Sequence, residues 1–181
     1  MEPRSKVEEA RPPQNRRQQH KNMARRGQVK PRKVEVDPIY GSPQITKLIN
    51  RSMKDGKKSV VRKEVYAAME LIKEKTETDP IKIFDQALDN IRPTMEVRPR
   101  RVGGAAYQVP MQVRGERRDS LAIRWLVGAA NSKSNSEFHT YGEKLASEII
   151  DASNGEGVSV KKRQEVERVA EANKAFAHFR W

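Results

Sequence analysis

Residues 95–113 read MEVRPRRVGGAAYQVPMQV and interrupt a chain that is otherwise patterned for helices. From Tyr107 onward, apolar residues alternate with glutamine or proline, which is the period-two pattern of a strand with one apolar face. Gly103 and Gly104 lie between the two halves of the stretch and suit a tight turn that needs positive φ. The sequence therefore predicts a β-hairpin over about residues 94–113.

Pro99 and Pro110 constrain the place of this hairpin in the fold. Proline has no N–H to donate to a neighbouring strand, so within sheets it is confined to edges. Both strands of a two-stranded ribbon are edges, and both prolines are tolerated there if their nitrogens face outward. We therefore predict a lone ribbon that projects from a helical body, not part of a larger sheet.

Helical periodicity flanks the hairpin on both sides. Three apolar segments with helical spacing precede it and three follow it, and the last is expected to run almost to Trp181. The pattern predicts a mainly α fold, with a six-helix body and a protruding two-stranded β-hairpin between the third and fourth helices. The signals that bound these helices are Ser42-Pro43, Asp55-Gly56, Asp79-Pro80, Pro93, the polar stretch 131–136 and Asn154-Gly155.

The first 36 residues are patterned differently from the rest. They have almost no apolar periodicity, and residues 1–33 hold eleven Lys or Arg against three Glu. Such a segment buries too little apolar surface to offset its ordering entropy. We predict a basic arm over residues 1–36 that is disordered when free, and a single helical domain over residues 37–181 that carries the hairpin. Residues 1–22 are either a genuine extension or an upstream start-codon assignment, and a solvated tail is the alternative for the arm.

Charge and missing residue types narrow the class of function. A formal net charge of +13 favours a polyanionic partner, nucleic acid first and an anionic membrane surface second. The chain has no cysteine, which excludes disulfides, zinc knuckles and thiol nucleophiles. His20, His139 and His178 have no metal-ligand spacing, and no apolar run approaches the ~20 residues of a transmembrane helix. We expect no enzyme activity, cofactor, metal or small-molecule substrate, and no membrane partner.

Cations gather in three places outside the arm. Residues 97–118 contain six arginines, no lysine and one acid, and planar guanidinium groups favour phosphate forks and stacking. Two further groups crowd the starts of the predicted second and sixth helices, against the helix dipole, so that a nearby anion would explain them. An ordinary solvated face is the alternative for each. The two groups are Lys57, Lys58, Arg62 and Lys63, and Lys161, Lys162 and Arg163.

Two aromatic residues could stack on bases. Trp125 lies on the apolar stripe of a predicted helix, so we expect it to belong to the core. For Tyr107, on the hairpin, core packing and base stacking both stay open.

Four strings in the chain resemble a known family. In this order and spacing they are similar to the small-subunit ribosomal protein seven family, of the bacterial or organellar type, over about residues 23–181. The strings are Asp37-Pro38-Ile39-Tyr40, Asp55-Gly56-Lys57-Lys58, the run from Arg100 to Ala105 continued by Tyr107-Gln108-Val109-Pro110, and the run from Ala170 to His178 with Arg180-Trp181.

The resemblance implies a structural constituent of the small ribosomal subunit, with a helical body and a protruding hairpin. It implies early binding to the 3′ major domain of small-subunit ribosomal RNA, nucleation of head assembly, and a hairpin near the exit-site transfer RNA. Neighbouring small-subunit proteins are further implied partners, and the cytoplasmic ribosome is favoured over an organelle ribosome. Two departures from the family pattern are the loop 131–142, which has Lys133 as its single lysine, and Phe179, where tyrosine is usual.

Individual contacts follow from joining the cationic clusters to this resemblance. The expected ribosomal RNA contacts are Arg25, Arg26, Lys30, Arg32, Lys33, Lys57, Lys58, Arg62, Arg98, Arg114, Arg117, Arg118, Lys161 and Lys162. The hairpin residues expected near transfer RNA are Arg100, Arg101, Gly103, Gly104 and Tyr107.

One competing function fits the same features. An architectural DNA-binding protein also inserts a basic ribbon into a groove. Such proteins are usually small obligate dimers, whereas this chain has enough helices to close a core alone. A helicase- or nuclease-like enzyme with a basic channel lacks every motif it would need.

Overall fold

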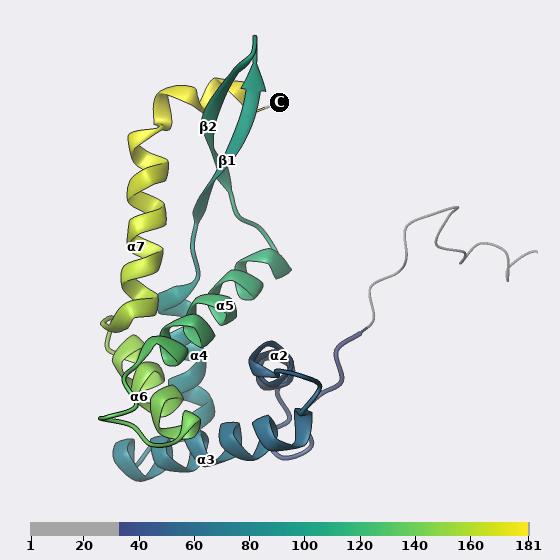
Figure 1. Cartoon of the computed structure of the whole chain (residues 1–181), viewed down its shortest axis with the longest axis vertical. Helices are drawn as coiled ribbons and strands as arrows, with labels where there is room; N and C mark the ends of the chain where they lie inside the picture. The colour runs from purple at the N-terminus through teal and green to yellow at the C-terminus, as the bar shows by residue number, and fades with distance from the viewer. Residues whose placement is uncertain (1–32, 181) are drawn as a thin grey trace, which may run out of the picture. The chain divides into compact units, whose positions relative to one another are not determined.

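The computed structural model describes residues 33–180, and residues from Val34 onward belong to one compact unit (Figure 1). Its order of elements confirms the predicted mainly α fold with a hairpin between the third and fourth helices of the described part. The expected arm falls almost wholly outside the described residues. The elements are α2 (Pro43–Ser52), α3 (Lys58–Thr76), α4 (Pro80–Ile91), β1 (Met95–Val102), β2 (Ala105–Gln112), α5 (Glu116–Ser132), α6 (Tyr141–Ser153), α7 (Gly157–Ala172) and the 3-10 helix η2 (Lys174–Phe179).

The helices begin where the sequence places their caps. The Ser42 hydroxyl accepts from the amide of Gln44 at 3.3 Å, and Asp79 accepts from the amide of Ile81 at 3.0 Å. In both cases proline occupies the first turn, where its missing N–H costs nothing. Thr140 and Glu143 form a reciprocal capping box at the start of α6.

The core lies where α6 packs against α3, α4 and α5, with α2 closing one side against α3 and α5. Full burial of one such apolar side chain contributes roughly 1.5–3 kcal/mol. The largest fully buried apolar side chains are Phe84, Ile45, Leu48, Ile49, Met69, Ile72, Leu88, Ile91, Leu126, Leu145 and Ile149.

A buried carboxylate fixes the segment that leads into α2. One oxygen of Asp37 accepts from the amides of Ile39 and Tyr40, each at 3.2 Å. The other accepts from the hydroxyl of Tyr66 on α3 at 2.8 Å. The conspicuous Asp-Pro-Ile-Tyr string is therefore explained by structure, because it ties the chain to α3.

The hairpin is a regular antiparallel pair that closes between Val102 and Ala105. Gly103 and Gly104 have φ of 58° and 90°, the positive values of a two-residue hairpin turn. Just below the strands, the amide of Val113 donates to the carbonyl of Thr94 at 3.0 Å.

The register confirms the expectation for the two prolines. Hydrogen-bonded and non-bonded pairs alternate in an antiparallel ladder. Counting from the bonded pair formed by Thr94 and Val113, the pairs that contain Pro99 and Pro110 are both non-bonded. Their nitrogens therefore face away from the partner strand.

The sixth helix ends earlier than predicted. α7 stops at Ala172, and η2 follows it, so the expectation of a helix running almost to Trp181 is wrong. The backbone and side-chain nitrogens of Asn173 both donate to the carbonyl of Val169, at 3.2 and 2.8 Å. These bonds close the last turn of α7, and the tighter 3-10 turns carry the following aromatic residues toward the hairpin.

No helix among residues 33–180 is long and apolar enough to cross a membrane.

Candidate nucleic-acid interface

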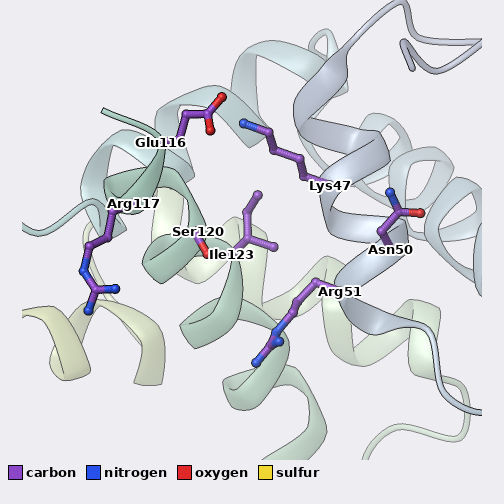
Figure 2. Close-up of a pocket in the computed structure, with 7 residues that line it drawn as sticks. All are labelled: Lys47, Asn50, Arg51, Glu116, Arg117, Ser120 and Ile123. Atoms are coloured by element: carbon purple, nitrogen blue, oxygen red, sulfur yellow. The ribbon is translucent and has the colours of Figure 1, made fainter. Parts of the chain in front are cut away.

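A groove of about 510 Å³ lies between α2 and α5 (Figure 2). Figure 2 shows Lys47 reaching toward Glu116 on one side of the groove, with Arg51 on the other side of Ile123. Arg51 lies in the last turn of α2, where the helix dipole favours a cation. The residues that line the groove are Lys47, Asn50 and Arg51 from α2, and Glu116, Arg117, Ser120 and Ile123 from α5.

Asp119 holds the two walls of this groove together. Its carboxylate accepts from the side-chain amide of Gln44 on α2 at 2.9 Å and from Arg92 Nε, just after α4, at 2.8 Å. Lys47 Nζ lies 3.9 Å from the same carboxylate. Because one side chain joins α2, the end of α4 and α5, the groove is formed before any ligand arrives.

Glu96 organises the arginines at the base of the hairpin. Arg98 Nε lies 2.5 Å from its carboxylate, and Arg117 lies 2.7 Å from it. Burial alone would raise the pKa of Glu96, but the hydrogen bonds from Arg117 and Arg98 outweigh it and hold that pKa below its usual range. Arg117 thus joins the hairpin base to the α2–α5 groove, and Glu96 offsets part of its charge.

The other two base arginines differ from Arg117. Arg114 is exposed and donates to the neutral amide oxygen of Gln112 at 2.8 and 3.1 Å, so this contact leaves its charge uncompensated. Arg118 is half-buried, and its Nε is a buried donor without a hydrogen-bond partner within the described residues. An unsatisfied buried donor of this kind is costly, and no acidic side chain among the described residues pairs with Arg118.

The predicted tip residues do not share one surface. Arg100 lies opposite Tyr107, and Arg101 lies opposite Ala106. Successive residues of a strand face opposite sides, so Arg100 is on the Tyr107 face and Arg101 is on the other. The Tyr107 ring packs against Phe176 and Phe179, with centroids 5.3 and 5.2 Å apart. The structure therefore favours packing over base stacking for Tyr107.

Trp125 is half-buried against the core, as its place on the helical stripe suggests.

The cations at the start of α3 lie as the sequence predicts. Lys57 occupies the cap position and Lys58 the first turn, and this end of α3 has neither an acidic residue in its first turn nor a side-chain cap. Arg62, one turn further, is half-buried with a buried Nε that lacks a hydrogen-bond partner in the described part of the chain. This helix end presents uncompensated positive charge.

The cluster on α7 is placed differently from the prediction. Because α7 begins at Gly157, Lys161 and Lys162 lie in its second turn, where the dipole effect is weak. Lys162 pairs with Glu165 at 2.7 Å. The start of α7 is instead held by the buried Glu148, which accepts from the amide and the hydroxyl of Ser159 at 2.9 and 2.7 Å. An RNA contact at this cluster loses the support of the dipole argument.

Lys133, the single lysine of the loop 131–142, forms contacts inside the fold. Its ammonium lies 2.8 Å from Asp151 and 3.3 Å from the buried Glu148, and it donates to Ser147 at 2.9 Å. The single lysine of this loop is thus part of the internal packing between α5 and α6.

The structure adds Lys47, Asn50 and Arg51, which the sequence analysis did not single out, to Arg117, which it did. Lys47 and Arg51 are four residues apart on the polar side of α2, and that spacing was the available signal. Among residues 33–180, no group of three or more metal-ligating side chains could hold an ion. Of the expected arm contacts, Lys33 is exposed, and Arg25, Arg26, Lys30 and Arg32 lie outside the described residues.

Comparison with known proteins decides the family. The model of the family described as ribosomal protein S7p/S5e matches residues 24–174. The chain belongs to this family. Membership in the S7p/S5e family makes it a structural ribosomal protein and not an enzyme, as the sequence predicts.

Three relatives illustrate how closely the chain follows the S7p/S5e family. Each is a small ribosomal subunit protein uS7, and each aligns over 159 residues, which are 88% of this chain and 100% of the relative. The proteins of Carboxydothermus hydrogenoformans and Thermoanaerobacter sp. (strain X514) are both 56% identical, and that of Thermodesulfovibrio yellowstonii is 57% identical.

Proposed function

We propose that this ribosomal protein binds the 3′ major domain of small-subunit ribosomal RNA directly, and that this binding helps to nucleate the subunit head. The hairpin tip lies near the exit-site transfer RNA, and neighbouring small-subunit proteins make further contacts on a cytoplasmic ribosome. The resemblance of the four sequence strings supports the identity of the RNA domain, and the α2–α5 groove supports the mode of binding.

The groove is the observation that carries this proposal. Lys47 and Arg51 bring two cations from α2 to the groove, where Lys47 reaches toward Glu116, and Asn50 and Ser120 add neutral hydrogen-bonding groups. Arg117 lies at the edge of the groove, with its guanidinium paired to Glu96. Cations supply affinity for phosphates, and neutral groups fix the register of a sugar-phosphate backbone. A preformed groove also avoids an ordering cost on binding. The arrangement fits a nucleic-acid backbone better than a small molecule.

The test removes two groove cations at once. We expect Lys47→Ala combined with Arg51→Ala to lower affinity for a 3′ major domain fragment on the order of tenfold to a hundredfold, because two charge-assisted phosphate contacts are lost. The slope of log affinity against log salt should become shallower by about 1.5. Filter binding at several salt concentrations measures both quantities.

A matched pair on α3 serves as the control. Lys73 and Lys75 are exposed in its last turn and do not line the groove. Replacing both with alanine makes the same change in net charge and should leave affinity within about twofold. Equal losses from the two pairs would mean that net charge alone, and not the groove, binds the RNA.

A further inference from the structure

Two sets of side-chain contacts join the hairpin to the C-terminal part of the chain. At the base, Glu167 on α7 accepts from the amide and the hydroxyl of Thr94 at 3.0 and 2.7 Å. Nearer the tip, the Tyr107 ring rests between Phe176 and Phe179 of η2. Figure 1 shows the yellow C-terminal turn beside the distal part of β2, and the two elements are in contact.

A cleft lies between the hairpin and the C-terminal part of the chain. It measures about 370 Å³, and the hairpin contributes Thr94, Met95 and Pro110 to its lining. Ala170 and Lys174 are among the residues on its other side. α7 contacts both strands and η2 contacts β2, and the ring cluster at Tyr107 is the contact nearer the tip.

The geometry of η2 suits this contact. Residues three apart in a 3-10 helix eclipse one another, so Phe176 and Phe179 project on the same side, toward Tyr107. The His178 ring lies 3.9 Å from the Phe179 ring between centroids, and its Nδ1 lies 2.8 Å from the carbonyl of Ala175. An uninterrupted α-helix would have turned the two phenylalanines about 60° apart.

We propose that the turn Lys174–Phe179 is a clamp that sets the direction of the hairpin tip, with Tyr107 as the positioning residue. An isolated two-stranded hairpin is marginally stable, and eight residues of strand extend about 26 Å. Over that length a tilt of roughly 10° at the base would move the tip by about 4–5 Å. Only two residue pairs and the Gly-Gly turn lie beyond Tyr107, so the clamp acts where it restricts this motion most.

The consequence of the clamp for transfer RNA rests on the proposed function, whereas the clamp itself can be tested without RNA. The chain has no cysteine, so spin labels can be placed at Ala106→Cys near the tip and Arg124→Cys on α5, both exposed positions. Double electron–electron resonance on the full chain then reports the distribution of distances between tip and body.

We expect a narrow distribution in the labelled parent and a distribution at least twice as wide with Phe176→Ala. Tyr107→Ala should act in the same direction, and Tyr107→Phe, which keeps the ring, should restore the parental width. A second pair of labels, at Gln112→Cys at the hairpin base and Arg124→Cys on α5, should give the same width of the distance distribution in every variant. Affinity of Phe176→Ala for the RNA fragment should stay within about twofold, because the groove is untouched.

Three results would overturn the clamp. The first is a parental distance distribution in Phe176→Ala. The second is broadening by Tyr107→Phe as large as that by Tyr107→Ala, which would implicate the hydroxyl and not the ring. The third is a loss of RNA affinity in Phe176→Ala as large as that of the groove pair, which would make the turn an RNA contact. If Lys47→Ala combined with Arg51→Ala left RNA affinity unchanged, the proposed function would be contradicted. The distance measurement would still test the clamp.

Discussion

The helical body carries opposite charges in two regions. Residues 64–91, which span most of α3 and all of α4, hold seven acidic residues against three basic ones, and residues 131–156, which include α6, hold five against two. These helices pack on one another. Residues 92–130, with the hairpin and α5, hold eight basic residues against three acidic ones. Within residues 64–156, positive charge is thus concentrated on the hairpin and α5, and this asymmetry orients the protein toward a polyanion as well as attracting it.

The largest expected effect tests whether the basic side neutralises phosphates. Affinity for the ribosomal RNA fragment should fall linearly on a log–log plot, on the order of a thousandfold between about 50 and about 200 mM salt, because bound cations release counterions. Filter binding over that range measures the slope. Replacing Glu70 and Glu74, on the acidic side, with glutamine should leave the slope unchanged. A flat response in the parent protein would show that the basic clusters are solvated surface.

A smaller effect separates two parts of the basic side. Replacing Arg114, Arg117 and Arg118 at the hairpin base with alanine should lower RNA affinity at least about tenfold and impair head assembly, since each lost phosphate contact weakens binding. Trimming residues 100–105 to a shorter turn should leave assembly nearly normal and change exit-site transfer RNA occupancy or reading-frame maintenance. Gradient profiles and a frameshift reporter measure the two outcomes. If the trimmed tip blocks assembly as severely as the base variant does, the separation of roles is wrong.

The smallest effect concerns the one acid buried within the basic side. Glu96→Gln should destabilise the fold by about 1 kcal/mol at neutral pH, a value discounted for the half-exposed arginines. The folded-state pKa of Glu96 is lowered, so its contribution is complete above the unfolded-state pKa and is lost as pH falls through the lowered value. Urea midpoints at about pH 7 and about pH 3 should therefore differ between parent and variant less at the lower pH than at the higher one.

Glu171→Gln is the matched control for this pH effect, because Glu171 forms an exposed pair with Lys174. It should change stability by less than about 0.5 kcal/mol at either pH. A Glu96→Gln variant that is equally destabilised at both pH values would show that the ion pairs contribute nothing measurable.

Local signals in the sequence were sufficient for most of the fold. Ser42, Asp79 and the Gly103-Gly104 turn act within a few residues of their own positions, so their effects can be read without knowing the tertiary structure. The end of α7 could not be read in this way, because Val169, Ala170 and Phe176 fit a continued helix equally well. Packing against Tyr107, 69 residues before Phe176, accompanies the switch to η2.

The candidate site was less accessible to sequence reasoning than the fold. The cationic strings were visible, but the groove depends on how α2 packs against α5, and no local pattern encodes that packing. The sequence analysis did not single out Lys47 and Arg51 for this reason. Lys133 shows the converse, because a lysine in a polar loop turns out to lie against the buried carboxylate of Glu148 and the partly exposed carboxylate of Asp151.

The outward-facing prolines of the hairpin have a consequence for the protein before it meets RNA. The outer edge of a strand offers a row of free N–H groups, onto which a second chain can add as a new strand. Pro99 and Pro110 fall at outward-facing positions in the two strands, so each edge lacks a donor in its interior. Another hairpin cannot pair along the full eight residues of either strand. A newly made molecule that has not yet bound RNA is therefore protected from polymerising by strand addition to its hairpin.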